Sequence, residues 1–232
     1  MIKISDAEYF SNDGTIRFLN MDCNEFMKGL KDNEFDLNLS DPPYGINWTK
    51  SINYSKQQKA SQNKFGYKTH IVKEWDSKKP EQIVFDNIKA TSKNQIIWGG
   101  NYFTDILPIT RCWIVWDKQG ENFTAINNEL AWTSFETKIK VFSRCSGLDK
   151  GFMNKDGGGI HPTEKPVYLY RWILQNYTKP TDTILDCFGG SMSNAIACHM
   201  ERRKLTIIEL DVDYFKSALK RFDFYERQLT LF

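Results

Sequence analysis

Residues 183–209 read TILDCFGGSMSNAIACHMERRKLTIIE, and this stretch decides the fold. Its two ends, 183–186 and 205–209, are short runs rich in β-branched and apolar residues, typical of buried strands, and the apolar spacing from about Ser191 to Arg202 predicts a helix between them. A strand, a helix and a second strand of these lengths form a βαβ unit, in which the two strands are parallel. Further helices are predicted on either side, over about 167–177 and 214–227. The last third of the chain therefore predicts one half of a doubly wound α/β fold.

The same alternation is found at the other end of the chain. A strand is predicted at 16–20, a helix from Cys23 to about Lys31, and a strand at 35–40. Four further short β-rich runs, bounded by turn residues, predict additional strands at 95–98, 112–116, 130–132 and 140–142. A chain of 232 residues without internal repeats has material for one substantial core. We expect a single domain over residues 1–232, built on a mixed, largely parallel sheet.

Composition excludes several classes of protein. Lys and Arg total 31 against 29 Asp and Glu, so the net charge of +2 excludes a uniformly basic coat for polyanions. The mean hydropathy is −0.53, and no apolar stretch approaches the roughly 18 to 20 residues of a membrane span. Five cysteines without a C-x-x-C pair and three histidines predict neither a disulfide framework nor a metal site. These features, with no export signal at the start, predict a cytoplasmic protein without membrane contact.

A glycine turn, Gly189-Gly190, follows the strand at 183–186, and Glu209 ends the next strand about 20 residues later. Glycines let the backbone approach a ligand, and an acid at this place can bind both hydroxyls of a ribose, so the pair favours an adenosine-containing cofactor. Glycine turns also serve packing alone in many α/β proteins. The G-x-G-x-x-G pattern is absent, which disfavours the alternative of a nicotinamide oxidoreductase.

The sequence Asp41-Pro42-Pro43-Tyr44 directly follows the strand at 35–40. An exocyclic amine of a nucleobase is a poor nucleophile because its lone pair is delocalised into the ring. A carboxylate from Asp41 and the carbonyl of Pro42 can accept its two N–H groups and localise that lone pair, which is electrostatic catalysis by preorganised acceptors. Successive prolines fix the direction of the carbonyl. Tyr44 offers a flat face on which an extruded base can stack.

With these motifs in this order, the chain resembles the β-class of S-adenosylmethionine-dependent amino-methyltransferases, which methylate N6 of adenine or N4 of cytosine in DNA. Residues 161–166, HPTEKP, are similar to the H-P-T-x-K-P element of that class, and residues 98–103 and 129–132 look like phage-type members. The resemblance runs from about Ile16 to the last helix. It implies a circularly permuted, Rossmann-like methyltransferase fold, S-adenosylmethionine as cofactor, DNA as substrate, no metal, and Asp41, Pro42, Pro43 and Tyr44 as catalytic residues.

The resemblance also implies a set of cofactor-binding residues: Asp22, Thr163, Lys165, Asp186, Phe188, Gly190, Ser191, Met192 and Glu209. Asp22 fits equally well as a helix N-cap. Met192 stands where the family has glycine, and we expect its side chain either to crowd the methionine part of the cofactor or to alter the turn. A DNA-binding protein with an impaired cofactor site is therefore an alternative. D-P-P-Y is typical of members that act on adenine and S-P-P-Y of those that act on cytosine, so adenine N6 is predicted, with cytosine N4 or an amine on RNA as alternatives.

DNA contacts are predicted in the lysine-rich segment 49–79, where aromatic residues alternate with lysines that neutralise phosphates. The candidates are Lys56, Lys59, Lys64, Phe65, Tyr67 and Lys68. A solvated loop without a DNA role is the alternative. Residues 143–160 form a second, smaller candidate segment. We expect a monomer or a homodimer acting on double-stranded DNA.

Overall fold

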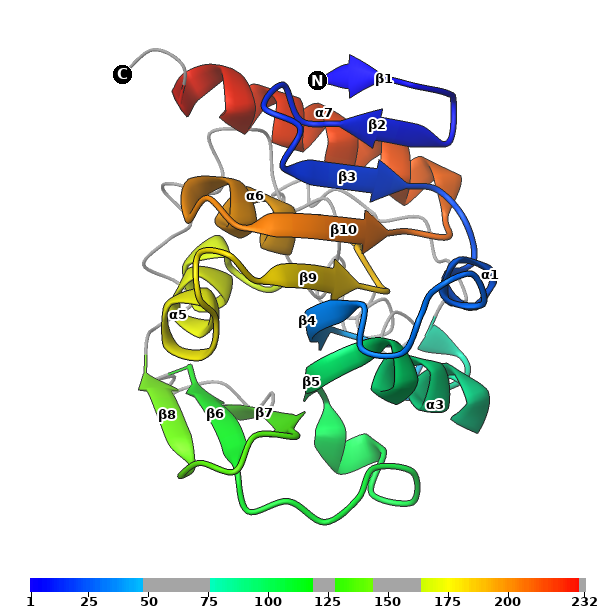
Figure 1. Cartoon of the computed structure of the whole chain (residues 1–232). Coiled ribbons are helices and arrows are strands. Elements are labelled where there is room, and N and C mark those ends of the chain that lie inside the picture. Colours follow the sequence, from blue (N-terminus) through cyan, green and yellow to red (C-terminus); the bar gives the residue numbers. More distant parts are fainter. Residues whose placement is uncertain (48–75, 119–127, 144–163, 230–232) are drawn as a thin grey trace, which may run out of the picture.

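The computed structural model describes residues 1–47, 76–118, 128–143 and 164–229. In this part of the chain ten strands form one sheet, in the order β1-β2-β3-β10-β9-β4-β5-β7-β6-β8 (Figure 1). The strands are β1 (Ile2–Lys3), β2 (Glu8–Phe10), β3 (Ile16–Leu19), β4 (Phe35–Ser40), β5 (Ser92–Trp98), β6 (Trp113–Asp117), β7 (Asn128–Thr133), β8 (Lys140–Ser143), β9 (Thr183–Asp186) and β10 (Lys204–Ile208). The helices are α1 (Cys23–Met27), α3 (Gln82–Thr91), α5 (Val167–Tyr177), α6 (Ser193–Met200) and α7 (Val212–Leu229), with a 3-10 turn at Gly100–Tyr102.

The centre of the sheet is parallel. β3, β10, β9, β4 and β5 run in one direction, with β10 paired to both β3 and β9 and with β4 paired to both β9 and β5. Antiparallel pairs extend both edges, through β1 and β2 on one side and through β7 on the other. The predicted α/β fold with a mostly parallel sheet is confirmed.

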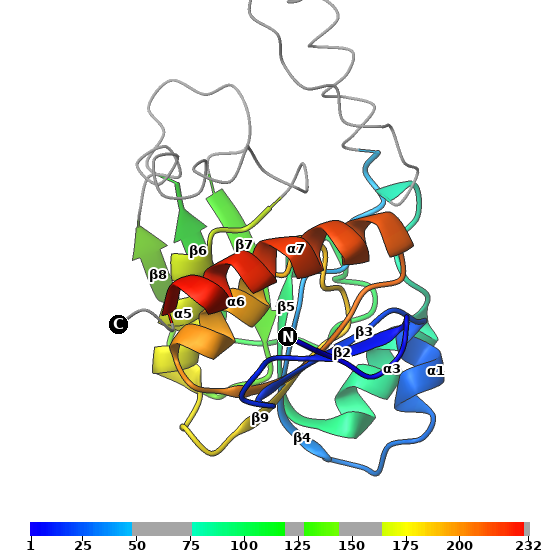
Figure 2. The same ribbon diagram turned by 90° about the horizontal axis from the view of Figure 1, so that it is seen from above.

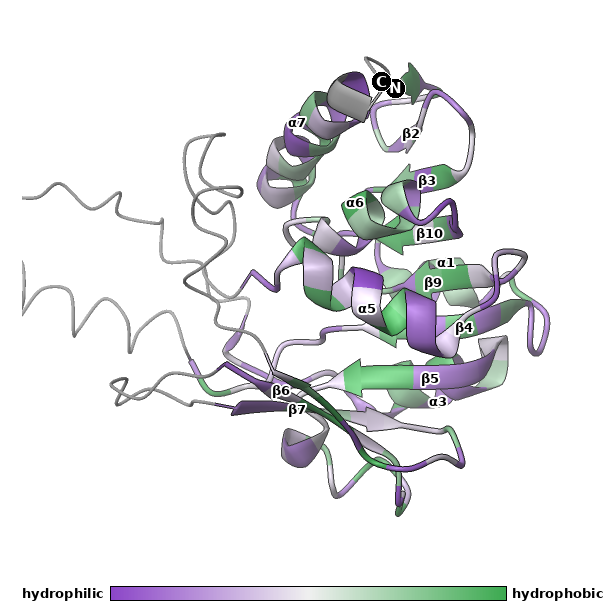
Figure 3. Ribbon diagram, turned by 90° about the vertical axis from the view of Figure 1, so that its left-hand side faces the viewer, coloured by the Kyte–Doolittle hydropathy of each residue, from purple (hydrophilic) through white to green (hydrophobic). Residues whose placement is uncertain are grey.

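Helices cover both faces of this sheet. Figure 2 shows α5, α6 and α7 on one side and α1 and α3 on the other. The buried residues form two clusters, one on each face of the sheet, because successive side chains of a strand point to opposite faces. On β5, Ile96 and Trp98 pack into the cluster under α5, α6 and α7, and Ile97 packs into the cluster under α1 and α3. Figure 3 shows β5 as hydrophilic at its start and hydrophobic toward its carboxyl end, where Ile96, Ile97 and Trp98 are buried.

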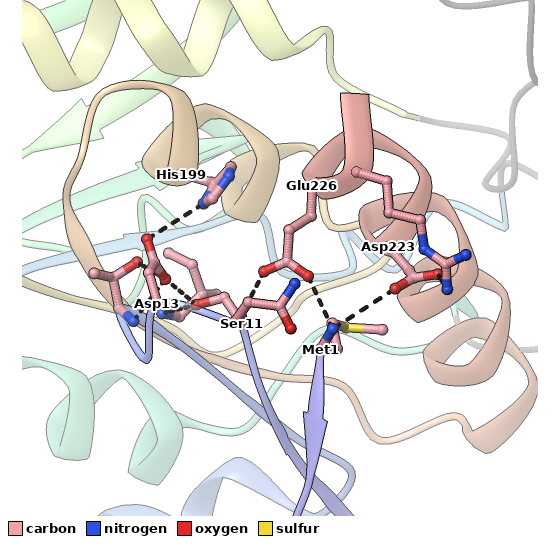
Figure 4. A network of polar contacts seen from close by, with 10 residues as sticks. Met1, Ser11, Asp13, His199, Asp223 and Glu226 are labelled. Atoms are coloured by element: carbon pink, nitrogen blue, oxygen red, sulfur yellow. Dashed lines mark hydrogen bonds and ion pairs between the residues drawn. The ribbon is translucent and has the colours of Figure 1, made fainter. Parts of the chain in front are cut away.

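The first strands are attached to the last helix by polar contacts (Figure 4). Glu226 on α7 is 1% exposed and accepts hydrogen bonds from the amine of Met1 at 3.0 Å and from the main-chain N–H of Asn12 at 2.6 Å. Nearby, Nδ1 of His199 on α6 lies 3.7 Å from a carboxylate oxygen of Asp13. Residues from opposite ends of the chain therefore close the same edge of the sheet.

Most elements lie where the sequence predicts them, with boundaries shifted by at most four residues. α1 ends at Met27 rather than near Lys31, because Gly29 and Leu30 close tight turns onto Phe26 and Met27. The sequence analysis did not predict β1, β2 or α3. None of the helices in the described residues is both long and apolar enough to cross a membrane.

Candidate active site

One cavity of about 1000 Å³ opens at the carboxyl ends of the parallel strands. β9 lies between β4 and β10, and the helices that follow these strands pack on opposite faces of the sheet, which creates a crevice of the kind that binds ligands in open α/β folds. The cavity brings together most of the predicted site residues: Asp22, Asp41, Pro42, Pro43, Tyr44, Lys165, Phe188, Gly190, Ser191 and Glu209.

Asp41 is the first residue after β4, and both of its carboxylate oxygens have partners. The hydroxyl of Tyr44 donates to Oδ1 at 2.7 Å, and the ammonium of Lys165 forms an ion pair with Oδ2. Burial raises the pKa of the Asp41 carboxyl, although Lys165 favours its charged form. The site thus holds a poorly hydrated carboxylate whose charge depends on a neighbouring ammonium.

The ring of Tyr44 is fixed from two sides. It stacks on Tyr102, with ring centroids 4.9 Å apart and an angle of 16° between the planes. On another side it meets the backbone of Gly99, where a Cβ atom would lie 2.2 Å from the ring. Gly99 also has a φ of +66°, in the left-handed region that favours glycine. Glycine at this position therefore sets the position of the tyrosine ring.

Lys165, for which the resemblance implied a cofactor contact, lies beside Asp41 and Tyr44 in the cavity. Its side chain is 3% exposed, and Nζ lies 3.1 Å from the Tyr44 hydroxyl and 3.3 Å from Oε2 of Glu129. Burial works to lower the pKa of this ammonium, but Asp41 and Glu129 outweigh that effect and raise it. Lys165 contacts Asp41, Tyr44 and Glu129 and also lines the cavity, so its contact with a cofactor stays a prediction.

Glu129, on β7, is a site residue that sequence reasoning missed. Its second oxygen, Oε1, pairs with Lys118 at the end of β6. Burial works to raise the pKa of the Glu129 carboxyl, but the ammonium groups of Lys165 and Lys118 outweigh it and lower that pKa. The available signal was an acidic residue in an otherwise largely apolar strand, Asn128–Thr133.

The opposite wall of the cavity is formed by the glycine turn after β9 and by Glu209 after β10. The main-chain N–H of Gly190 donates to Oε2 of Glu209, and the N–H of Asp211 donates to Oε1, both at 2.7 Å. Burial raises the pKa of the Glu209 carboxyl, although these backbone donors favour the charged form. A Cβ atom on Gly190 would meet only a carbonyl oxygen 4.0 Å away, so the turn leaves open space above it.

Asp22 lies on the same wall and is the N-cap of α1. Its Oδ1 accepts the main-chain N–H groups of Asn24 at 2.7 Å and of Glu25 at 3.3 Å. The N-cap alternative is confirmed, and because Asp22 also lines the cavity, its contact with a cofactor stays a prediction.

Two of the predicted cofactor residues are turned into the protein. Asp186 is 2% exposed and accepts hydrogen bonds from Phe188 N–H at 3.0 Å and from the Asn194 amide at 2.9 Å, and burial raises its pKa to about 7. It shapes the turn without lining the cavity.

Met192 is fully buried in the core cluster under α5, α6 and α7, so the prediction that its side chain crowds the cavity is wrong. Its φ of +57° keeps the left-handed conformation that a glycine adopts there. The turn therefore points the methionine side chain inward.

Several predicted residues lie outside the described part of the chain. These are Thr163, most of the segment 143–160, and the DNA-contact candidates Lys56, Lys59, Lys64, Phe65, Tyr67 and Lys68. Among the described residues there is no group of three or more His, Cys, Asp or Glu side chains that could hold a metal ion.

Comparison with known proteins adds to this geometry. The model of the DNA methylase family matches residues 4–220. Type II methyltransferase M2.MboI of Moraxella bovis is 26% identical over 256 residues, covering 92% of this chain and 90% of that protein. DNA adenine methyltransferase YhdJ of Escherichia coli (strain K12) is 36% identical over 63 residues, covering 27% of this chain and 21% of that protein.

Two solved structures share the fold. The M1.HpyAVI–SAM complex has a TM-score of 0.55 at 21% identity and covers 89% of this chain and 98% of its own. The cytosine-N4-specific PvuII DNA methyltransferase has a TM-score of 0.60 at 13% identity and covers 95% and 93%.

Proposed function

Because this chain belongs to the DNA methylase family, whose methyl donor is S-adenosylmethionine, we propose that it methylates N6 of an adenine extruded from double-stranded DNA. One observation carries the proposal: Asp41 and Glu209, at the ends of β4 and β10, line the same cavity. An amine acceptor and a ribose acceptor on facing walls place an acceptor base and an adenosine-containing donor side by side.

The residues of the cavity fit S-adenosylmethionine. A volume of about 1000 Å³ accommodates this cofactor together with a base. The Glu209 carboxylate is held in place by two backbone N–H groups, which leaves its remaining lone pairs for ribose hydroxyls. The open space above Gly190 allows the cofactor to approach the backbone closely.

When bound, S-adenosylmethionine supplies a methyl group on a positively charged sulfur. The chain's own residues prepare the acceptor: Asp41 accepts one N–H of the base amine, the Pro42 carbonyl accepts the other, and Tyr44 stacks on the ring. These contacts localise the lone pair of the nitrogen, which would form the bond to the methyl carbon as the carbon–sulfur bond breaks and leaves its electron pair on sulfur. The amine would then release one proton to water. No covalent enzyme intermediate is needed.

Adenine is proposed as the target because the motif reads D-P-P-Y and because YhdJ, similar over part of the chain, is named a DNA adenine methyltransferase. Cytosine N4 is the second candidate, since the cytosine-N4-specific PvuII enzyme shares the fold. We propose further that residues 49–79 and 143–160 contact the DNA, through the lysines and aromatic residues named above, and that the protein acts as a monomer or a homodimer.

Calorimetric titration with S-adenosylmethionine, followed by product analysis, tests the proposal. DNA from a methylation-deficient bacterium is incubated with protein and methyl-labelled cofactor, and the hydrolysed nucleosides are separated by mass spectrometry. We expect cofactor binding and labelled N6-methyldeoxyadenosine. The Asp41→Ala variant should bind the cofactor but transfer no methyl group. Labelled N4-methyldeoxycytidine would move the target to cytosine, and absence of cofactor binding even with DNA would favour a DNA-binding protein with an impaired site.

A further inference from the structure

Both oxygens of the Asp41 carboxylate are occupied before any base enters. Oδ1 accepts from the hydroxyl of Tyr44, and Oδ2 is paired with the ammonium of Lys165. An N–H group of a target amine needs one of these oxygens in hydrogen-bonding geometry. A target amine that donates to Asp41 must therefore share one oxygen with its present donor, and it gains a carboxylate oxygen of its own only if Tyr44 or Lys165 moves away.

Lys165 is the partner that has a second acceptor. Its Nζ already lies 3.3 Å from Oε2 of Glu129, and a small movement of the flexible lysine chain would transfer it from one carboxylate to the other. The Tyr44 ring, in contrast, is held between Tyr102 and Gly99.

A second acceptor is necessary because the ammonium is deeply buried. The Lys165 side chain is 3% exposed, and an ammonium that loses its partner in such a place pays a large desolvation cost. The rings of Trp98 and Tyr44, 5.1 and 5.6 Å from Nζ, add a favourable surface for a cation but no charge. The carboxylate of Glu129 supplies the negative charge that the ammonium needs once it leaves Asp41.

Glu129 is itself held in place. Lys118 pairs with its Oε1, so Oε2 is directed to Lys165. Asp41, Glu129, Lys165 and Lys118 make up two negative and two positive charges, and transfer of the Lys165 ammonium between the carboxylates leaves that balance unchanged.

We propose that Glu129 is a positioning residue for methyl transfer: it takes up the Lys165 ammonium when the target amine takes Oδ2 of Asp41. This proposal rests on the proposed function, since it assumes that an amine binds at Asp41. Glu129 acts through Lys165 and contacts neither the reacting nitrogen nor the methyl group.

The kinetic test uses Glu129→Gln, with Glu201→Gln as the control. Glu201 also loses an ion pair, to Arg171 at 2.7 Å, but does not line the cavity. We expect Glu129→Gln to slow single-turnover methyl transfer roughly 10- to 100-fold, as displaced reacting groups do, with unchanged affinity for S-adenosylmethionine. Glu129→Asp, which keeps the charge, should recover part of the rate, and Glu201→Gln should match the wild type. A normal rate in Glu129→Gln overturns the proposal.

Dependence on Lys165 is tested by combining Glu129→Gln with Lys165→Met. If Glu129 acts through the ammonium, its substitution has no further effect on the transfer rate once the ammonium is gone. An additional loss of the same size as in the wild-type background would show that Glu129 acts independently of Lys165 and would refute the proposal.

A second measurement needs no activity and remains decisive if a variant transfers too little methyl to measure. Thermal unfolding is compared for Asp41→Asn, Glu129→Gln and the double variant. Each single substitution leaves Lys165 one carboxylate, so the melting temperature should fall modestly, whereas the double variant should lose more than the sum. Strict additivity would show that the two carboxylates do not share the ammonium.

A wild-type protein that binds the cofactor but methylates nothing would refute the proposed function. The unfolding experiment would still decide whether Asp41 and Glu129 share the Lys165 ammonium.

Discussion

The main-chain N–H of Gly190 donates a hydrogen bond of 2.7 Å to Oε2 of Glu209, so the turn after β9 is tied to the residue that ends β10. The same carboxylate accepts from Asp211 on its other oxygen. Glu209 thus has two tasks. It holds the shape of the glycine turn, and it presents an acceptor to the cavity.

From this relationship we predict that Glu209→Ala weakens S-adenosylmethionine binding roughly 10- to 100-fold, the size expected for losing hydrogen bonds to a charged group. The loss combines a missing ribose acceptor with a turn that is no longer held. Calorimetric titration measures it. Binding of the variant to DNA without cofactor should equal that of the wild type, and an unchanged cofactor affinity would contradict the assigned role.

Gly99→Ala should move the Tyr44 ring, because the added Cβ would lie 2.2 Å from it. We expect methyl transfer to fall at least about tenfold while cofactor affinity stays the same, since the stacking surface is displaced and the opposite wall is untouched. Gly14→Ala is the matched control: φ is +72° there, but the new Cβ has no neighbour within 4 Å. Equal activity in the two variants would argue against a positioned Tyr44.

Met192 offers a paired experiment on backbone strain. Met192→Gly and Met192→Ala both remove a fully buried side chain, at a cost of about 2–5 kcal/mol, but only glycine relieves the left-handed backbone, by about 1 kcal/mol. Urea unfolding should therefore find the glycine variant the more stable of the two, and both less stable than the wild type. Cofactor affinity should change in neither, and tighter binding in Met192→Gly would restore the idea that methionine obstructs the cavity.

Arg221, on α7, stabilises the turn after β9 through hydrogen bonds to Ser191 and Ser193. It donates to the carbonyl of Ser191 at 2.9 Å and to the hydroxyl of Ser193 at 3.0 Å, and its ion pair with Glu164 is 2.6 Å long and almost fully buried. Arg221→Met should lower the free energy of unfolding by about 3–5 kcal/mol, because it removes the arginine partner of a buried carboxylate. Adding Glu164→Gln should recover part of this loss. Arg171→Met, which breaks a more exposed pair, should cost no more than about 1 kcal/mol.

Asp186 should make stability depend on pH. Burial raises its pKa to about 7, so between pH 4 and pH 7 the folded protein retains a proton that the unfolded chain has lost. Its contribution is fully present below its ordinary pKa and declines as pH rises to about 7, at up to about 1.4 kcal/mol per pH unit. The free energy of unfolding is measured with urea at pH 5 and at pH 7. In Asp186→Asn this part of its decline between the two pH values should be absent.

The control for that experiment is Asp36→Asn. The hydrogen bond from Lys93 lowers the pKa of Asp36, so its stabilisation is lost only as pH falls through the acid range, and the slope between pH 5 and pH 7 should stay as in the wild type. The carboxyls of Asp41 and Glu209 also have raised pKa values and contribute slopes of the same sign. An Asp186→Asn slope equal to that of the wild type would show that this carboxyl is ionised in the folded protein.

The positions of Asp41 and Glu209 could be predicted from the sequence because each directly follows a strand-forming run. Parallel strands bring such ends to one edge of a sheet, where the structure places both residues in one cavity. Glycines and prolines marked where the strands end. These signals are local in the sequence, so they can be recognised without knowledge of how the chain packs.

Glu129 and Arg221 could not be found in this way, because their roles depend on partners from distant parts of the chain. Glu129 becomes a site residue only when β7 brings it to Lys165, and Arg221 only when α7 crosses the cofactor turn. The error at Met192 has a related cause. A turn residue can point its side chain to either side of the backbone, and the buried surface under α5, α6 and α7 decides which.

The order of the strands has a consequence for how the chain folds. Residues 16–19 of β3 pair with residues 205–208 of β10, and β9 lies between β10 and β4. During synthesis the ribosome releases β3 long before its neighbour β10, and β4 long before its neighbour β9, so two apolar strand edges stay unpaired in the nascent chain. Such long-range pairing is slow to form. Methylation capacity therefore arises only after β9 and β10 have been synthesised, and chaperone supply or slower expression should raise the yield of soluble protein.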